Sequence, residues 1–140
     1  MEVNLGLNMK LVFVYGSLKH GMTHHNLLQG QRYVGVALTA PRYAMFQLSG
    51  YPALIDSSDG KRLWGELYEV TDDCVSAMDR LEGVNQDIYE RRQVELDELH
   101  PVRLPRTQEA FALFDSKKAD CYFYRQSVEG ARNCGSFWAV

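Results

Sequence analysis

Short runs of apolar residues separated by turn-forming residues dominate the first half of the chain. The run Leu11–Val14 is uniformly apolar, which predicts a buried strand. Tyr33–Thr39 alternates large and small side chains, with Val34 on one face and Gly35 and Ala37 on the other. This pattern predicts a half-buried strand whose small face is closely approached by another backbone.

The middle of the chain predicts three more strands. The first two are Tyr43–Leu48 and Gly50–Ile55, in which Pro52 favours an edge or strand-start position. Asp56–Gly60 then has the Asp-Gly chemistry of a hairpin turn, so Leu63–Val70 is expected to be the returning strand. Several short strands joined by such turns predict a compact, curled sheet such as a barrel.

Residues 71–83 carry the clearest helix signal. Thr71 can cap the helix, and Asp72 and Asp73 complement the positive charge of its first turn. Gly83 is typical of a residue that ends a helix. Between them, apolar residues recur at helical spacing: Val75, Met78 and Leu81.

The remaining elements are short. Thr23–Leu28 indicates a short helix, and Tyr89–Leu96 and Ala119–Arg125 indicate strands. Asp97–Lys118 lacks a regular pattern, so we expect a long connection that contains a short helix at Gln108–Phe114.

The composition is typical of a soluble globular protein, with 46% hydrophobic and 24% charged residues among 140. That length predicts one domain, which we place at residues 9–140 after an N-terminal extension at residues 1–8. The net charge of −3 and the lack of a dense Lys/Arg run argue against a nucleic-acid partner.

The same sequence favours a cytoplasmic protein without a membrane segment. It contains no apolar stretch approaching the ~20 residues that span a bilayer, and no secretory signal. Its three cysteines lack metal-type spacing and suit a reducing compartment.

The turn after Leu11–Val14 is the first candidate binding site. The strand stops at Gly16 and Ser17, and a Gly-containing turn leaves backbone N–H groups that can hold an anion such as a carboxylate. Several tyrosines lie near the predicted strand ends, where a hydroxyl could fix a polar substrate group or simply belong to the core. They are Tyr15, Tyr51, Tyr89 and Tyr124.

Glu82 is the acidic residue with the most suggestive setting. It lies in the last turn of the predicted helix, where unpaired carbonyl groups disfavour a carboxylate. Partial burial would raise its pKa towards neutrality, which suits proton transfer. The alternative is an exposed glutamate of no consequence. Glu66, in the middle of a predicted strand, is a rival base unless it lies on a solvated face or bonds a neighbouring strand.

The candidate nucleophiles and metal ligands favour structural roles. Ser17 lacks the Gly-x-Ser-x-Gly pattern of a nucleophile elbow. Cys74 lies in the first turn of a predicted helix, but Asp72 and Asp73 oppose its ionisation. The adjacent pair His24-His25 is poorly arranged to chelate one metal.

The order of several short motifs resembles the γ-glutamylcyclotransferase-like family, and most closely its γ-glutamylamine cyclotransferase branch. The motifs are Phe13–Leu18, Gly50–Pro52, Trp64–Val70, Asp79–Gly83, Tyr89–Arg92 and Tyr122–Tyr124. The resemblance to the branch rests on Leu18–Gly21 and His25-Asn26, whereas Asp97–Lys118 departs from the family pattern.

The resemblance implies an α+β fold, a small mixed-sheet barrel flanked by short helices. It implies that the turn of Tyr15, Gly16, Ser17 and Leu18 binds the α-carboxylate of a small γ-glutamyl substrate through backbone amides. Glu82 would be the general acid/base of an intramolecular aminolysis that releases 5-oxoproline and a free amine, without a cofactor.

Three alternatives remain at this point. The fold could serve as a non-catalytic module that binds γ-glutamyl or amino-acid ligands. The aromatic residues Phe137 and Trp138 could dock a partner protein, or Cys74 could serve a hydrolase. The sequence leaves the leaving amine and the oligomeric state open.

Overall fold

The computed structural model describes residues 9–16, 19, 21–22 and 24–136. The strands are β1 (Met9–Val14), β2 (Arg32–Thr39), β3 (Tyr43–Gln47), β4 (Pro52–Asp56), β5 (Trp64–Thr71), β6 (Tyr89–Pro101), β7 (Lys118–Tyr124) and β8 (Arg132–Asn133). The α-helices are α1 (Asp72–Leu81) and α2 (Gln108–Asp115), and the 3₁₀ helices are η1 (His25–Leu28) and η2 (Val84–Gln86).

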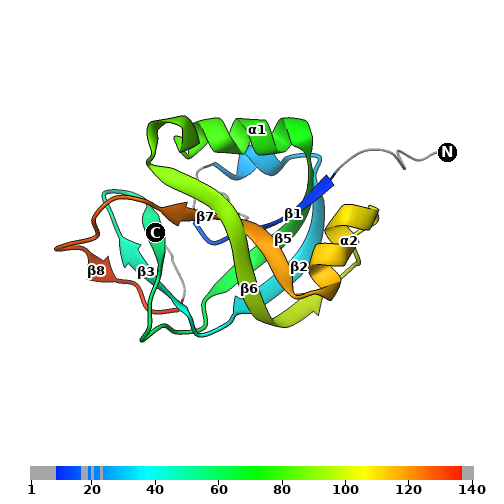
Figure 1. Cartoon of the computed structure of the whole chain (residues 1–140). Coiled ribbons are helices and arrows are strands. Elements are labelled where there is room, and N and C mark those ends of the chain that lie inside the picture. Colours follow the sequence, from blue (N-terminus) through cyan, green and yellow to red (C-terminus); the bar gives the residue numbers. More distant parts are fainter. Residues whose placement is uncertain (1–8, 17–18, 20, 23, 137–140) are drawn as a thin grey trace.

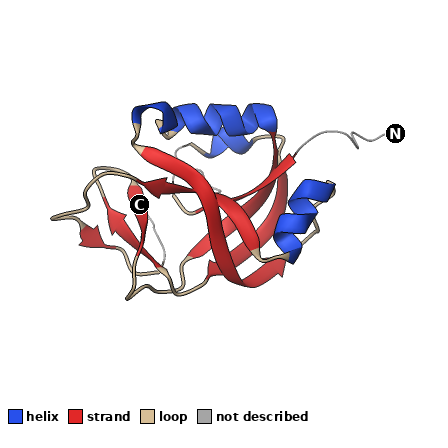
Figure 2. Ribbon diagram, viewed as in Figure 1, coloured by secondary structure: helices blue, strands red, loops and turns tan. Residues whose placement is uncertain are grey.

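Five strands close into a barrel in the order β1-β5-β2-β6-β7, and β4-β3-β8 form a small sheet beside it (Figure 1). The barrel is mixed because β1 runs parallel to β7, which it meets at Val12↔Asp120, while the other pairs are antiparallel. Short helices flank the barrel (Figure 2). The predicted α+β mixed-sheet barrel is therefore confirmed.

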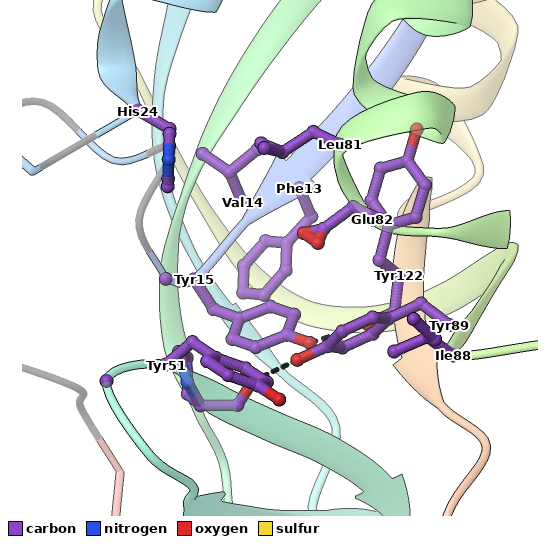
Figure 3. A pocket seen from close by; sticks show the side chains of 13 residues that line it. Phe13, Val14, Tyr15, His24, Tyr51, Leu81, Glu82, Ile88, Tyr89 and Tyr122 are labelled. Carbon is purple, nitrogen blue, oxygen red and sulfur yellow. Dashed lines mark hydrogen bonds between the residues drawn. The ribbon is translucent and has the colours of Figure 1, made fainter. Parts of the chain in front are cut away.

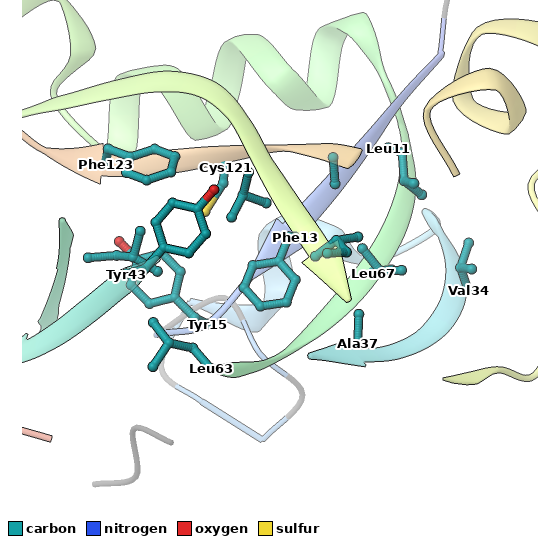
Figure 4. Close-up of a cluster of buried hydrophobic side chains, with 14 of the residues drawn as sticks. Leu11, Phe13, Tyr15, Val34, Ala37, Tyr43, Leu63, Leu67, Cys121 and Phe123 are labelled. Carbon is teal, nitrogen blue, oxygen red and sulfur yellow. The ribbon is translucent and has the colours of Figure 1, made fainter. Parts of the chain in front are cut away.

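Both faces of β1 are buried from Leu11 to Val14, which explains the uninterrupted apolar sequence of these four residues. Leu11 and Phe13 point into the barrel, where they meet Leu67 and other fully buried side chains (Figure 4). Val12 and Val14 belong to a second cluster on the outer side, with residues of α1. A strand covered on both faces reads as a continuous hydrophobic run.

Helix α1 packs over the barrel through the apolar residues that its sequence predicts. Val75 and Met78 are buried against the outer side of the barrel, whereas Leu81 remains 39% exposed. Thr71 caps the helix by accepting a hydrogen bond from the Cys74 backbone N–H at 3.2 Å. The predicted helix and its cap are confirmed.

The alternation predicted for β2 is wrong after Val34, because it assigns the wrong residues to the buried face. A register shift between Tyr33 and Gly35 places Val34 and Ala37 in the barrel core, and leaves Val36 only half-buried. The expected close backbone approach occurs at Gly35, where a Cβ would lie 2.3 Å from the His100 carbonyl oxygen. A bulge changes which face of a strand the following residues occupy.

The hairpin predicted at Asp56–Gly60 is wrong. Strand β4 pairs with β3, and β5 pairs with β1 and β2, so this turn joins the small sheet to the barrel. Neither Asp59 nor Gly60 has a positive φ. Gly60 is needed for space instead, because a Cβ there would lie 2.3 Å from the Tyr43 nitrogen.

The segment predicted to be a long connection is largely regular. Strand β6 continues to Pro101 because its second half changes partner from β7 to β2. The helix expected at Gln108–Phe114 is confirmed as α2, which contacts β1 and β7 and buries Ala110 in the barrel core.

At the N-terminal side, a 3₁₀ helix replaces the expected short helix, and its predicted cap Thr23 lies outside the described residues. The predicted extension at residues 1–8 and the aromatic residues Phe137 and Trp138 also lie outside them. Within the described ranges, no helix is long and apolar enough to cross a membrane.

Candidate active site

A pocket of about 310 Å³ opens where β1 ends. Its walls come from the end of β1, the loop that leads into β4, the end of α1 and the start of β6 (Figure 3). Five residues proposed from the sequence as catalytic or substrate-binding line it together: Tyr15, Gly16, Tyr51, Glu82 and Tyr89. The structure thus brings together proposed site residues that are up to 74 positions apart in the chain, from Tyr15 to Tyr89.

Glu82 enters the pocket from the C-terminal end of α1 (Figure 3). It is the C-cap residue, and its N–H donates to the Met78 carbonyl oxygen at 2.9 Å. Gly83 follows with a φ of +66°, the left-handed conformation that commonly ends a helix. The helix end and the glycine therefore fix the direction in which the glutamate side chain leaves the backbone.

The Glu82 carboxylate has no hydrogen-bond donor or cation as a partner in the described part of the chain. Burial raises its pKa from 4.5 to about 7. The neighbouring phenols of Tyr15 and Tyr89 also have raised pKa values, because burial disfavours their ionised forms. They are neutral near pH 7, so of these three groups only Glu82 changes its charge near neutral pH.

Tyr15 and Tyr89 form the floor of the pocket, and their hydroxyl hydrogens are already used. Tyr15 Oη donates to the Tyr122 carbonyl oxygen at 2.6 Å, and Tyr89 Oη donates to the Pro52 carbonyl oxygen at 2.7 Å (Figure 3). These bonds tie β1 to β7 and β6 to β4 beneath Glu82. The two phenol oxygens can still accept a hydrogen bond from a ligand.

The other two proposed tyrosines differ in position. Tyr51 lies at the mouth of the pocket and is 40% exposed. Tyr124 does not line the pocket; it packs edge-on against Tyr89, with ring centroids 5.2 Å apart. Tyr124 is therefore placed to support Tyr89, whereas Tyr51 is placed to touch a ligand.

The turn after β1 joins the pocket at Gly16, while Ser17 and Leu18 lie outside the described residues. A Cβ on Gly16 would lie 2.7 Å from Pro52 Cγ, so only glycine lets the turn pack against that proline. Lys19 N–H donates to the Gly16 carbonyl oxygen at 3.0 Å, which closes the turn. The binding of a carboxylate by its amides stays a prediction.

A polar network that sequence reasoning missed holds the end of α1. Arg91 on β6 donates to Asp79 Oδ1 from Nε at 3.0 Å and to Asp120 Oδ2 from Nη1 at 2.9 Å. Tyr122 Oη also donates to Asp79 Oδ1, at 2.6 Å. Asp79 precedes Glu82 by three residues, so the network clamps the turn of helix that carries Glu82. The three-residue spacing between Asp79 and Glu82 was the sequence signal that could have indicated this support.

The rival candidates lie elsewhere. Glu66 does not line the pocket, and its Oε1 accepts a hydrogen bond from Tyr68 Oη at 3.1 Å. The Cys74 thiol is buried, lies 3.4 Å from the Leu27 carbonyl oxygen, and has a pKa that burial raises further. A thiol in that state is a poor nucleophile.

The pocket is also lined by residues that the sequence analysis did not propose as catalytic or substrate-binding. They are Phe13, Val14, His24, Pro52, Leu81, Ile88 and Tyr122, with Gly50. Within the described residues, no group of histidine, cysteine or acidic side chains could hold a metal ion. The arrangement can therefore do proton transfer next to a mainly apolar ligand site.

Comparison with known proteins adds a family to this geometry. Residues 12–138 match a family model described as "Gamma-glutamyl cyclotransferase, AIG2-like". A Vibrio cholerae protein named "Putative gamma-glutamylcyclotransferase" is 38% identical over 85 residues, which cover 61% of this chain and 71% of that protein. A Methanocaldococcus jannaschii protein with the same description is 34% identical over 89 residues, covering 63% and 72%.

A solved structure supports the fold. The crystal structure of an AIG2-like protein from Mus musculus has a TM-score of 0.71 against this chain, at 19% sequence identity. The match covers 94% of this chain and 89% of the mouse chain.

Proposed function

Because the chain belongs to the AIG2-like γ-glutamyl cyclotransferase family, we propose that it cyclises a γ-glutamyl amide to 5-oxoproline and releases a free amine. The observation that carries this proposal is the Glu82 carboxylate, which faces a pocket without an internal partner and has a pKa of about 7. An unpartnered, partly buried carboxylate is costly to keep unless it serves a function.

The proposed reaction needs no nucleophile from the protein. The α-amine of the substrate attacks the carbonyl carbon of its own γ-amide, so that a new C–N bond closes a five-membered ring. The bond from that carbon to the leaving nitrogen then breaks. The pocket contributes by holding the flexible glutamyl chain with amine and carbonyl in contact, which can supply much of the rate enhancement.

Glu82 has two proton transfers in this scheme. As a carboxylate it takes a proton from the attacking amine, and as a carboxylic acid it delivers that proton to the leaving nitrogen. A group with a pKa of about 7 is present in both forms near neutral pH, which suits it to both steps. The leaving amine then departs with its full complement of protons, and no net proton is gained or lost.

The proposed substrate position places the α-carboxylate at the turn after β1. Gly16 at the start of this turn lines the pocket together with Glu82, and its carbonyl oxygen accepts a hydrogen bond from the Lys19 N–H. Backbone amides at such a turn can hold an anion. A carboxylate held there would direct the α-amine and the γ-amide towards Glu82.

The Glu82→Gln variant tests the proposal, because it keeps the side-chain shape and removes the base. Purified protein is incubated with a panel of γ-glutamyl amides, and 5-oxoproline is measured by chromatography. We expect Glu82→Gln to lose about 10²-fold to 10⁴-fold in kcat/KM. Glu66→Gln is the matched control, because Glu66 lies outside the pocket.

Two outcomes would contradict the proposal. Near-wild-type release of 5-oxoproline by Glu82→Gln would remove Glu82 from the chemistry. Tight binding of γ-glutamyl amides by the wild-type protein without any turnover would instead favour a binding module on the same fold.

A further inference from the structure

We propose that a groove at the start of β1 binds an extended acidic segment of a partner protein, with its carboxylates at Arg103 and Arg106 and its apolar side chains at Phe111. Met9 at the start of β1 lines this groove, whereas Val14 at the end of the strand lines the pocket of Glu82. The two sites are separate, so the proposal does not depend on the proposed function.

The groove has a volume of about 840 Å³. Its walls come from the starts of β1 and β2, the end of β5, and α2 with the loop before it. Helix α2 contacts β1, and Figure 1 shows it beside the start of that strand. A hollow of this size can take up the side chains of an extended segment, as the grooves of peptide-binding domains do.

Exposed apolar side chains gather at this end of the barrel. Ala110 is the one buried residue of α2, and Phe111 lines the groove while 41% exposed. Val102 and Leu104, in the loop before α2, are 67% and 52% exposed. These three make up half of the six large hydrophobic side chains that are exposed in the described chain. Such a concentration of exposed apolar surface is typical of an interaction site.

The loop that carries these residues is fixed to the barrel. The Val102 N–H donates to the Val34 carbonyl oxygen at 2.8 Å, and Arg32 Nε donates to the Leu104 carbonyl oxygen at 3.1 Å. A partner would therefore bind a surface that is already ordered, which lowers the entropy cost of association.

Three arginines lie together on this surface, although the net charge of the chain is −3. Burial lowers the pKa of the Arg32 guanidinium, and the positive charges of Arg106 and Arg103 lower it further. Arg32 Nε lies 3.7 Å from Glu69 Oε1, but neither Arg103 nor Arg106 has an ion-pair partner among the described residues. Both side chains are exposed, so carboxylates of a partner can reach them.

Two acidic residues also line the groove. Glu69 is 1% exposed, and the N–H groups of Arg106 and Thr107 already donate to it. Asp115 is the last residue of α2, about 12 Å along the helix from the arginine loop. The carboxylates of a partner therefore belong at the Arg106 end of the groove.

The same features disfavour other occupants. A second copy bound through the same face by a two-fold axis would place its arginines against these arginines. A nucleic acid or an anionic bilayer would contact the arginines, but it would be repelled by the net negative charge and would leave Phe111 in the hollow uncovered. An acidic segment with apolar side chains satisfies both parts of the surface.

Three fluorescent peptides of about twelve residues test the proposal against the full chain by fluorescence anisotropy. The first alternates glutamate and leucine, the second glutamate and serine, and the third lysine and leucine. We expect the first peptide to bind at least about 10-fold more tightly than either of the others. Raising the ionic strength from about 0.05 M to about 0.5 M should weaken its binding about 5-fold, because exposed charges are screened.

A double variant tests the arginines. Arg103→Ala with Arg106→Ala should weaken binding of the glutamate–leucine peptide about 5-fold or more. Arg42→Ala with Arg132→Ala is the matched control, because it removes two exposed arginines that lie outside the groove. The control should leave the Kd within about 2-fold, since both double variants change the net charge equally.

A second pair of variants tests the apolar part. Phe111→Ala should weaken binding about 5-fold, because it removes an aromatic side chain from the groove. Trp64→Ala is the control, because Trp64 is 37% exposed and does not line the groove. The double variant of the arginines and Phe111→Ala should leave 5-oxoproline release unchanged.

Several outcomes would overturn the proposal and leave cyclisation standing. They are equal binding of the three peptides, equal losses in the variants and their controls, and tighter binding of a twelve-nucleotide oligothymidylate or of phosphatidylserine vesicles. A dimer in solution that Phe111→Ala dissociates would assign the groove to a second copy instead. Peptide binding that arises only in a full-length Leu5→Asp, Leu7→Asp variant would assign it to the N-terminal segment of this chain. The comparison of peptides on the wild-type protein decides the matter even if a variant does not fold.

Discussion

Glu69 and Glu82 are two carboxylates withdrawn from water in very different surroundings. Glu69 on β5 is 1% exposed and accepts hydrogen bonds from the backbone N–H groups of Arg106 and Thr107 at 2.9 and 2.7 Å. The Thr107 hydroxyl donates to it as well, and Arg32 Nε lies 3.7 Å away. Glu82 is less deeply buried and has no such partner among the described residues.

The difference shows that burial alone does not identify a functional carboxylate. Glu69 is saturated, and its hydrogen bonds fasten the loop that leads into α2 to the barrel. Glu82 has its hydrogen-bonding capacity unused and directed into a pocket. A satisfied buried charge holds structure together, whereas an unsatisfied one in a cavity is available to a ligand.

The largest expected effect is a loss of activity when Glu82 is replaced, but not when Glu69 is replaced. Glu82→Gln should reduce kcat/KM for 5-oxoproline release by at least about 10²-fold, while Glu69→Gln should change it less than about 3-fold per folded molecule. Steady-state kinetics, corrected for the folded fraction by circular dichroism, checks both. A similar loss in the two variants would mean that Glu69 acts on the site and that the contrast is mistaken.

The second prediction concerns stability, for which Glu69 rather than Glu82 is expected to be the more important residue. Glu69→Ala leaves two backbone N–H groups and the Thr107 hydroxyl without their acceptor. We expect the free energy of unfolding to fall by about 3 kcal/mol, which urea denaturation measures. Glu109→Ala, which removes an ion pair of partly exposed groups with Lys10, is the control and should cost less than about 1 kcal/mol. Equal costs would argue against an anchoring role for Glu69.

A third prediction follows from the pKa of Glu82, which is raised to about 7 in the folded protein from 4.5. Between these two values the folded state holds a proton that the unfolded state has lost, so stability falls as pH rises from 4.5 to 7. Above pH 7 both states are ionised and the loss is complete; below 4.5 it is absent. Glu82→Gln removes this titration.

The variant should therefore be more stable than the wild type at pH 8, by about 3 kcal/mol, and show little difference at pH 4. Thermal or urea unfolding at both pH values measures the difference. A gap of the same size at pH 4 and pH 8 would show that Glu82 is not titrating between them. Glu69→Ala is expected to be less stable than the wild type at pH 8, the opposite sign.

The sequence could predict features whose signals lie close together in the chain, but not those that depend on contacts between distant segments. Glu82 was identified because its signals, the cap at Thr71 and the glycine at position 83, lie within one helix. The barrel followed from short apolar strands. The pairing partner of each strand was harder to predict from the sequence. The Asp56–Gly60 turn has the residues of a hairpin, yet β5 pairs with β1 and β2 in the barrel.

The same limit applies to β6 and to the site. Residues Asp97–Pro101 are mostly polar or exposed, so no local pattern revealed that β6 changes partner and continues along β2. That Leu81 and Ile88 both line the pocket is likewise visible only after folding, because Ile88 packs against the left-handed Gly83. Local chemistry in the sequence indicated Glu82 as the candidate acid/base, whereas tertiary contacts define the surroundings of its side chain.

The smallest predicted effect concerns the clamp that orients Glu82. Asp79→Asn keeps the side-chain shape but weakens its ion pair with Arg91, so the last turn of α1 should hold Glu82 less firmly. We expect kcat to fall about 10-fold with KM within about 2-fold, because the residues that line the pocket are unchanged. Asp56→Asn, which weakens the exposed pair with Arg92, is the matched control and should leave kcat unchanged. A rise in KM at constant kcat would instead assign Asp79 to substrate binding, and unaltered kinetics would mean that Gly83 and the helix backbone orient Glu82 without the clamp.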